Sequence, residues 1–386
     1  MTILKGLTWN NHWHTDTIAA LSNLFEVNNP DSRIEWCYRS LDAYHSELFS
    51  ANVNHYDIVL FKNLHMASII STGILMPLED IIHESTINNL KKHAVGNSFK
   101  AYAQGGHQYG LPFTVTSLVG AYRADLMENL GMDVPKTWME VLHFCKALPN
   151  KMRVMMSLKP WNLYDAFRCY IGGFHRGHAE AFIIGETEVS EALAFFEELI
   201  HYIDPSGFHM SMLELYSRMS SVDDIVYTPM IIGNANYSKD GYRKNLIDFC
   251  DIPAHHEQVT NGIFYSSGLG ITIESKHKDM AADFLRMITS KEVQDHMIVD
   301  FDGHPLYKER WFNKENNQQT NRYFINTYES VNHAVNPSVI KGDDEKRLEI
   351  GTVIWHYLKS RKANRPQLVT ALTQLMNAYE KQIIWH

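Results

Sequence analysis

The first residues of the chain place an apolar run, a polar stretch and an amphipathic segment in succession. Residues 3–7 (ILKGL) predict a buried strand, and residues 8–14 (TWNNHWH) are polar and aromatic. Apolar residues then recur at helical spacing, at Ile18, Leu21, Leu24 and Phe25. Thr15 or Asp16 is available as the N-cap of this helix. The pattern predicts a strand, a loop and a helix, and in an open α/β sheet such a loop lies where ligands bind.

The same order is repeated further along the chain. Residues 33–36 predict a short strand and residues 41–49 a helix, before the apolar run YDIVLF (residues 56–61). A near-continuous apolar run suits a central parallel strand. It ends in the polar stretch KNLH, and a helix follows to about Ser71, with Gly73 as its C-cap. Repeated strand, loop and helix predict a parallel sheet with right-handed crossovers.

The middle of the chain carries clear turn and cap signals. Gly105 and Gly106 predict the turn of a hairpin, and residues 116–123 (TSLVGAYR) predict a strand. Residues 137–140 (TWME) predict a capping box that opens a helix through Ala147. Further helical patterns cover residues 161–170 and 190–202.

Two more apolar strands adjoin polar stretches in the second half. VYTPMIIGNANYS (residues 226–238) predicts a strand that leads into an amide-rich loop, and NGIFYSSGLGITI (residues 261–273) predicts a Gly-Ser loop that leads into a strand. Residues 278–298 place apolar side chains on one face, and from about Tyr307 the chain is predicted to be mainly helical.

Length and charge narrow the class of protein. A chain of 386 residues suggests about two domains. The net charge of −9 argues against a nucleic-acid partner, which would need clustered Lys and Arg. No run of about 18 apolar residues predicts a membrane span, and no signal peptide precedes the polar loop. We therefore expect a cytoplasmic protein if Met1 is the native start, or a mature form from which a signal was removed. The four cysteines lack C-x-x-C spacing and are expected to be free, buried thiols.

Three longer stretches resemble the sugar-binding family of extracellular solute-binding proteins of ABC transporters, which includes maltose-binding protein. Residues 110–148 are similar to the lobe crossover of that family, with its Y-R-x-D-L helix start and its G-x-x-V-P-x-T-W turn. Residues 266–294 resemble its glycine-rich return strand and following helix, and residues 57–80 resemble the strand and helix before the crossover. The resemblance covers most of residues 1–312, and the remaining tail matches only in being helical.

The resemblance implies an α/β, two-lobe periplasmic-binding-protein-like fold of type II, with hinged lobes that close over a ligand cleft. Hinges are expected near Pro112, near Asn261–Phe264 and near Gly303–Leu306. We expect lobe 1 to hold residues 1–111 and 264–303, and lobe 2 to hold residues 112–263. Residues 304–386 are expected to form a helical segment that belongs mainly to lobe 2.

In this architecture five stretches are expected to face the cleft as loops: residues 9–14, 62–65, 113–117, 233–237 and 265–268. Their amides and hydroxyls match the hydroxyls of a sugar, and their aromatic rings can pack against its C–H faces. With Trp161, whose helix start in lobe 2 is expected to reach the cleft, the predicted ligand-binding residues are Trp9, Asn11, His12, Trp13, Lys62, Asn63, His65, Thr114, Thr116, Trp161, Asn234, Asn236, Tyr237, Tyr265, Ser266 and Ser267. Trp13 is the expected aromatic wall, whereas Trp138 is expected to be a packing residue.

Other chemistries have weaker support in the residues. The 21 histidines raise a metal hypothesis, because His12 and His14 would point the same way on an extended backbone, but no further ligands are linked to them. A glycosidase needs two carboxylates, and the five stretches contain none unless Asp16 reaches inward. No nucleophile elbow, phosphate loop or Rossmann glycine fingerprint is present. We therefore expect a protein without catalytic activity, cofactor or metal. A metal-dependent enzyme remains a weaker alternative.

The sequence and this resemblance thus predict a substrate-binding component of an ABC transporter that captures a carbohydrate or a sugar acid. We expect it to be a monomer in the periplasm or cell envelope and to have permease subunits as partners. Lys62 departs from the family pattern, and its charge could favour an anionic ligand; the alternative is a solvated lysine at a loop edge. A cytoplasmic sensor that kept the fold is the second hypothesis.

Overall fold

The computed structural model describes residues 1–10, 14–175, 183–255, 262–335, 343–360 and 364–381. The chain divides into two compact units, of which the first contains Met1–Thr116 and Tyr265–Asn316 and the second contains Ser117–Phe264 and Asn317–Trp385. The chain passes between units inside strand β6 (Leu111–Tyr122), at the start of strand β10 (Phe264–Ile271) and inside helix α13 (Lys314–Gln319). Residues 304–316 thus lie in the first unit, and the predicted hinge positions stay predictions.

The first unit is built on a mixed sheet. Its strands are β1 (Thr2–Trp9), β2 (Ser32–Arg39), β3 (Ile58–Lys62) and the parts of β10 and β6 that belong to this unit, in the order β2-β1-β3-β10-β6. β1 is parallel to both β2 and β3, which confirms the predicted parallel arrangement of these strands. β10 returns antiparallel to β3. A hairpin of β4 (Ala103–Gln104) and β5 (His107–Gln108) confirms the predicted Gly105-Gly106 turn, where both glycines have positive φ.

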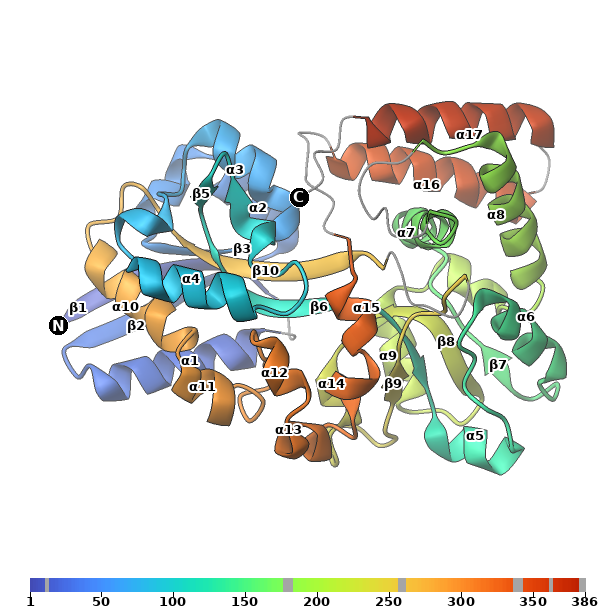
Figure 1. Cartoon of the computed structure of the whole chain (residues 1–386), viewed down its shortest axis with the longest axis horizontal. Coiled ribbons are helices and arrows are strands. Elements are labelled where there is room, and N and C mark those ends of the chain that lie inside the picture. The colour runs from blue at the N-terminus through green and yellow to red at the C-terminus, as the bar shows by residue number, and fades with distance from the viewer. Residues whose placement is uncertain (11–13, 176–182, 256–261, 336–342, 361–363, 382–386) are drawn as a thin grey trace. The chain divides into compact units, whose positions relative to one another are not determined.

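Helices cover this sheet. They are α1 (Thr15–Asn28), α2 (Leu41–Leu48), α3 (Met66–Thr72), α4 (Glu84–His93), α10 (Lys278–Ile288), α11 (Lys291–His296) and α12 (Lys308–Trp311). Helices α1 and α2 lie on opposite sides of the β1 and β2 strands (Figure 1), and Phe25 of α1 packs on Phe284 of α10 with ring centroids 5.4 Å apart. Gly73 ends α3 with φ of 63°, as predicted.

The predicted N-cap of α1 was wrong. The residue at that position is His14, and its side chain makes no capping bond. Thr15 is already inside the helix. The reason is that the His14 ring turns back to β1, where its Nε2 lies 3.2 Å from Thr8 Oγ1 and 3.3 Å from the Trp9 carbonyl oxygen.

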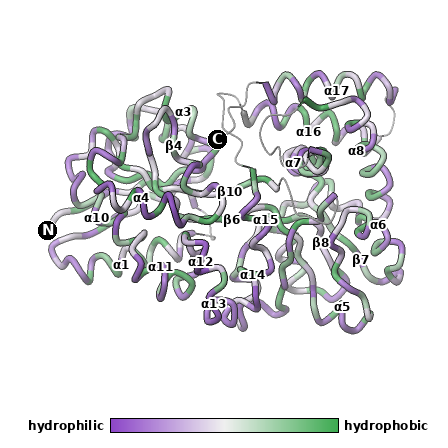
Figure 2. The backbone as a smooth tube through the Cα atoms, in the orientation of Figure 1, coloured by the Kyte–Doolittle hydropathy of each residue, from purple (hydrophilic) through white to green (hydrophobic). Residues whose placement is uncertain are grey.

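The second unit continues from β6 with a smaller sheet. β8 (Ile225–Ile232) and β9 (Asp248–Cys250) both pair antiparallel with β6, and β7 (Arg153–Val154) pairs parallel with β8. Seven of the eight β8 residues are buried, which agrees with the mainly apolar sequence of this strand. Figure 2 shows the corresponding hydrophobic colouring along this strand.

Most of the second unit is helical, as its sequence predicted. The helices are α5 (Ala124–Leu130), α6 (Trp138–Ala147), α7 (Pro160–Gly172), α8 (Glu186–Leu199), α9 (Met212–Met219), α14 (Tyr323–Asn326), α15 (Tyr328–Asn332), α16 (Asp343–Ser360) and α17 (Arg365–Glu380). At the start of α6 the Glu140 N–H donates to Thr137 Oγ1 at 3.2 Å, as predicted. The Glu140 carboxylate, however, accepts from the Lys136 N–H at 2.7 Å. The second hydrogen bond of the capping box is therefore made with the residue before the N-cap Thr137, and not with Thr137 itself.

Two charged pairs are buried beside α7. Arg168 Nε lies 2.6 Å from Glu380 Oε1 of α17, and Arg347 Nη2 of α16 lies 2.5 Å from Asp165 Oδ1. All four side chains are at most 4% exposed. A buried charge needs a partner of opposite sign, so these pairs hold the C-terminal helices against α7.

Two of the five stretches predicted to be loops are strand residues. Phe113–Ser117 lie within β6, and Tyr265–Gly268 lie within β10. β6 and β10 are neighbours in the sheet, so ladder hydrogen bonding keeps both segments extended despite their Pro, Gly and Ser content. At Gly268 a Cβ would meet the Tyr102 ring, so the glycine serves close packing and not a turn.

The cysteines follow the prediction only in part. All four are free thiols, but only Cys145 and Cys169 are buried, whereas Cys37 and Cys250 are partly accessible. Of the helices that the structure describes, none has the length and apolar content to cross a bilayer.

Candidate ligand-binding site

The ends of three strands meet at one edge of the first unit. β1 and β3 are parallel with Leu7 opposite Val59, so Trp9 and the residues after Phe61 reach the same edge. On the other side of β3, Lys62 is opposite Ser267 of β10. The Ser267 N–H donates to Thr114 Oγ1 of β6 at 2.9 Å. The fold therefore brings together four predicted ligand residues that are far apart in the sequence.

Trp9 closes this edge from the β1 side and is only 5% exposed. Its ring centroid lies 4.7 Å from that of His14 and 5.1 Å from that of Tyr44, and Lys62 Nζ is 5.4 Å from the Trp9 ring centroid. Most of the ring surface is therefore covered by the protein. The part left for a ligand is small.

Two histidines at this edge are buried and held neutral. Burial, opposed by the hydrogen bond to Trp9 and reinforced by the charge of Lys62, lowers the pKa of His14 to about 4. Burial, with smaller effects of Lys62 and His45, lowers the pKa of His65 well below its ordinary value. Nδ1 of His65 accepts the Lys62 N–H at 3.3 Å. His65 therefore shapes the end of β3 as a neutral ring.

The hydroxyl and amide groups here are partly used within the protein. Asn63 Oδ1 accepts the Ser266 N–H at 3.3 Å, and the hydroxyls of Ser266 and Tyr102 lie 2.6 Å apart. Asn63, Ser266 and Ser267 are nearly buried, whereas Thr114 and Tyr265 are half-buried. Thr116 is 8% exposed, at the last position of the first unit.

In the second unit, the turn after β8 carries the other predicted amides. Asn234 Oδ1 accepts the Asn236 N–H at 3.1 Å, and both residues are 5% exposed. Tyr237 stacks on Tyr216 with ring centroids 4.1 Å apart and a 19° angle between the rings. Burial raises the pKa of Tyr237, while Arg243 opposes that shift. This turn is a packed element, since its side chains are fixed by their neighbours.

Trp161 is half-buried in the first turn of α7. The guanidinium carbon of Arg347 lies 4.5 Å from its ring centroid. One face of the ring is therefore covered by a cation. Asn11, His12 and Trp13 lie outside the described residues.

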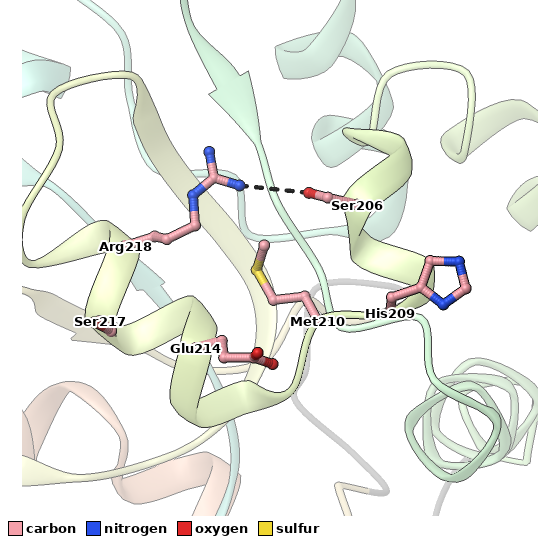
Figure 3. Close-up of a pocket in the computed structure, with 6 residues that line it drawn as sticks. All are labelled: Ser206, His209, Met210, Glu214, Ser217 and Arg218. Carbon is pink, nitrogen blue, oxygen red and sulfur yellow. Dashed lines mark hydrogen bonds between the residues drawn. The ribbon is translucent and has the colours of Figure 1, made fainter.

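The sequence did not indicate a hollow of about 390 Å³ in the second unit, lined by Ser206, His209, Met210, Glu214, Ser217 and Arg218 (Figure 3). It lies between the turn Pro205–Phe208 and α9, and Arg218 Nη1 donates to Ser206 Oγ at 3.4 Å. The S-x-x-E motif of Ser211 and Glu214 is a capping-box signal in the sequence, and it marks the start of α9. No pattern in the sequence relates Arg218 to Ser206.

Among the residues that the structure describes, no three His, Cys, Asp or Glu side chains are grouped as a metal ion would require.

Comparison with known proteins identifies the class of protein to which this chain belongs. The model of the bacterial extracellular solute-binding protein family matches residues 40–306, and the chain belongs to that family. Its members are binding proteins.

Solved structures show the same two-lobe fold across the whole chain. Maltose-bound MalE3 of T. maritima has a TM-score of 0.80 at 14% identity, over 98% of this chain and 100% of that one. An ABC transporter solute-binding protein of Agrobacterium vitis with bound D-mannitol has a TM-score of 0.73 at 16% identity, over 99% of each chain.

Among curated proteins, the putrescine/cadaverine-binding protein of Pseudomonas aeruginosa is 24% identical over 164 residues, which are 42% of this chain and 43% of that protein. The match thus spans less than half of the relative.

Proposed function

We propose that this protein is the substrate-binding component of an ABC transporter and captures a carbohydrate, a polyol or a sugar acid without transforming it. The observation that carries the proposal is the meeting of Trp9, Lys62, Ser267 and Thr114 at one edge of the first unit. Hydroxyls and a cation at one edge, beside the small accessible part of the Trp9 ring, suit a polyhydroxylated ligand. The maltose and D-mannitol in the similar structures support the same ligand class.

The residues proposed to contact the ligand are those of the predicted set that the structure describes: Trp9, Lys62, Asn63, His65, Thr114, Thr116, Trp161, Asn234, Asn236, Tyr237, Tyr265, Ser266 and Ser267. The proposal includes permease subunits as partners, a monomeric state and a location in the periplasm or cell envelope. Adjacent permease and ATPase genes would support transport over a role as a cytoplasmic sensor.

A thermal-shift screen of the whole chain tests the ligand class. The panel contains neutral sugars, polyols, sugar acids, putrescine, amino acids and zinc. We expect the largest stabilisation from a member of the first three groups, of about 2.7 kcal/mol at 100 times the dissociation constant. A response to putrescine, amino acids or zinc alone would overturn the proposal. NMR of the bound compound after incubation should show it chemically unchanged.

A pair of matched variants tests the second-unit turn. The Asn236 N–H donates to Asn234 and its carbonyl accepts from Lys239, so Asn236→Ala keeps both backbone bonds. We expect this variant to weaken the screened ligand by about 1 kcal/mol, the scale of one hydrogen bond. Asn88→Ala, on α4 of the first unit, is the control and should bind normally. Equal affinities of the two variants would remove Asn236 from the site.

A further inference from the structure

We propose that Arg347 is a positioning residue, which holds the Trp161 ring as a rigid platform for the ligand to stack on. The inference rests on the proposed function, because Trp161 is one of the residues proposed to contact a carbohydrate-like ligand. Arg347 itself is outside that set and acts on binding only through the ring. All residues of this arrangement belong to the second unit.

One turn of α7 provides the surroundings of the Arg347 guanidinium. The guanidinium carbon lies 4.5 Å from the ring centroid of Trp161 and 5.2 Å from that of Tyr164. Arg347 Nη2 also lies 2.5 Å from Asp165 Oδ1. Residues 161, 164 and 165 share one face of α7, because side chains three and four positions apart on a helix are neighbours. The guanidinium therefore contacts a ring in the first turn and a carboxylate one turn later.

Burial keeps this arrangement in place. The side chains of Arg347 and Asp165 are 1% and 0% exposed. A buried charge that left its partner would be uncompensated, so the pair is costly to separate. The attraction between a guanidinium and an aromatic ring within about 6 Å adds to this. A rotation of the Trp161 ring away from Arg347 would lose that attraction, so the ring is held in a defined orientation.

A glycine of α16 brings this helix close to the start of α7. Gly351 lies one turn after Arg347, and a Cβ at this position would be 1.9 Å from the Pro160 carbonyl oxygen. Only a glycine allows the two backbones to approach in this way. Pro160 precedes Trp161 directly, and its ring fixes φ in the first turn of α7. The backbone that carries Trp161 is thus held by the same helix that supplies the guanidinium.

The accessible part of Trp161 is not the face that Arg347 covers. Trp161 is half-buried, whereas Trp138 of the same unit is 2% exposed. Within the part of the chain that the structure describes, the Trp161 indole N–H donates to no acceptor, whereas that of Trp355 donates to the Phe208 carbonyl oxygen. An accessible ring with an available N–H can stack on the C–H face of a sugar and donate to a hydroxyl. A ring already fixed before binding also loses less conformational freedom when the ligand arrives.

Isothermal titration of the full chain tests the inference. The compounds are the neutral sugars, polyols and sugar acids of the thermal-shift panel, including maltose, D-mannitol and glucuronate, and the probe is the one that binds most tightly. Trp161→Leu should weaken probe binding about tenfold, because it removes the stacking ring. Arg347→Lys keeps a charge beside Asp165 but loses the planar contact with the ring, and should weaken binding about fivefold. Arg168→Lys, the same change in the other buried pair of α7, is the matched control and should bind within about twofold of the wild type.

A double variant distinguishes positioning of the ring from a general loss of structure. Because Arg347 acts through the ring, Arg347→Lys should weaken binding in the wild type and cause no further loss in Trp161→Leu. A merely structural role would give the same loss in both backgrounds. If thermal melting shows that Arg347→Lys is unfolded, Arg347→Gln with Asp165→Asn replaces it, since this pair removes both charges from the interior and can still hydrogen-bond. The same loss of affinity is expected from it.

The outcomes separate this inference from the proposed function. Probe binding that Trp161→Leu leaves unchanged would show that the ring does not contact the ligand, which overturns the inference and leaves the proposed function intact. Binding that the Arg347 variants leave unchanged, or a loss that is equal with and without the ring, would overturn the role of Arg347 alone. Binding of none of the sugars, polyols and sugar acids would overturn both.

Discussion

The Nε2 atoms of His45 and His65 lie 3.1 Å apart in the first unit, at hydrogen-bond distance. The two rings are nearly perpendicular, with an angle of 89° between them. One nitrogen must donate and the other must accept, so the contact requires at least one neutral ring. His65 meets that requirement because it is buried. This edge of the sheet is therefore built for neutral imidazoles and should be sensitive to acid.

His14 gives the clearest test of that sensitivity. Unfolded histidine gains a proton below pH about 6.5, whereas folded His14 gains one only below about 4. Between these values the unfolded state binds more protons, so the free energy of unfolding rises with pH. The expected contribution is about 3 kcal/mol, present above pH 6.5 and lost by pH 4. Urea unfolding from pH 4 to 7 should be less pH-dependent in His14→Gln, whereas the exposed His143→Gln should follow the wild type.

Asp248 should have the opposite effect to His14: it should make the free energy of unfolding fall as pH rises, over a similar pH range. Burial raises its pKa to about 6, from 3.8, despite a hydrogen bond from Asn321. Between pH 4 and 6 the folded state keeps a proton that the unfolded state has lost, so stability falls as pH rises. We expect Asp248→Asn to be more stable than the wild type at pH 7 by roughly 2–3 kcal/mol and equal to it near pH 4. Asp240→Asn, an exposed change, is the control. An unchanged pH profile of unfolding in Asp248→Asn would contradict the raised pKa.

Trp138 is expected to matter for stability and not for ligand binding. It is 2% exposed, and its ring centroid lies 5.6 Å from that of Phe195 and 6.0 Å from that of Tyr170. Trp138→Ala should lower the free energy of unfolding by about 3–5 kcal/mol through the cavity it leaves. Met139→Ala, exposed on the same helix, should cost less than about 0.5 kcal/mol. Loss of ligand affinity in Trp138→Ala at an unchanged melting temperature would mean that the binding residues are misplaced.

The Arg168 and Glu380 pair should be more costly to break than to replace. Removing one partner with Glu380→Met leaves a buried guanidinium, and Arg168→Met leaves a buried carboxylate, so each single change should cost about 3–5 kcal/mol. The double change Arg168→Met with Glu380→Met should recover most of that loss, because it removes both charges from the interior. Chemical denaturation of the two single variants and the double variant completes a mutant cycle. Additive losses would show that the two charges do not stabilise each other.

Local sequence signals were sufficient to predict most of the helices and strands. The apolar runs that became β1, β3 and β8, the Gly73 cap and the Thr137 cap all depend on residues within a few positions of one another. Such signals are readable because backbone conformation and capping are set by near neighbours. The resemblance in the crossover stretches added the two-lobe fold and the family, which periodicity alone does not give.

Sequence alone determined the inventory of groups at this edge: a lysine, amides, hydroxyls and rings, with no carboxylate in the five stretches. Only the tertiary structure decided their roles. It turned His14 back onto Trp9 and drew residues 113–117 and 265–268 into strands, because sheet partners distant in the chain take up their backbone groups. It also buried the Trp9 ring, which the sequence predicted to contact the ligand, and it placed the Lys62 ammonium over that ring. Burial and pairing depend on residues that meet only after folding, so no local pattern carries them.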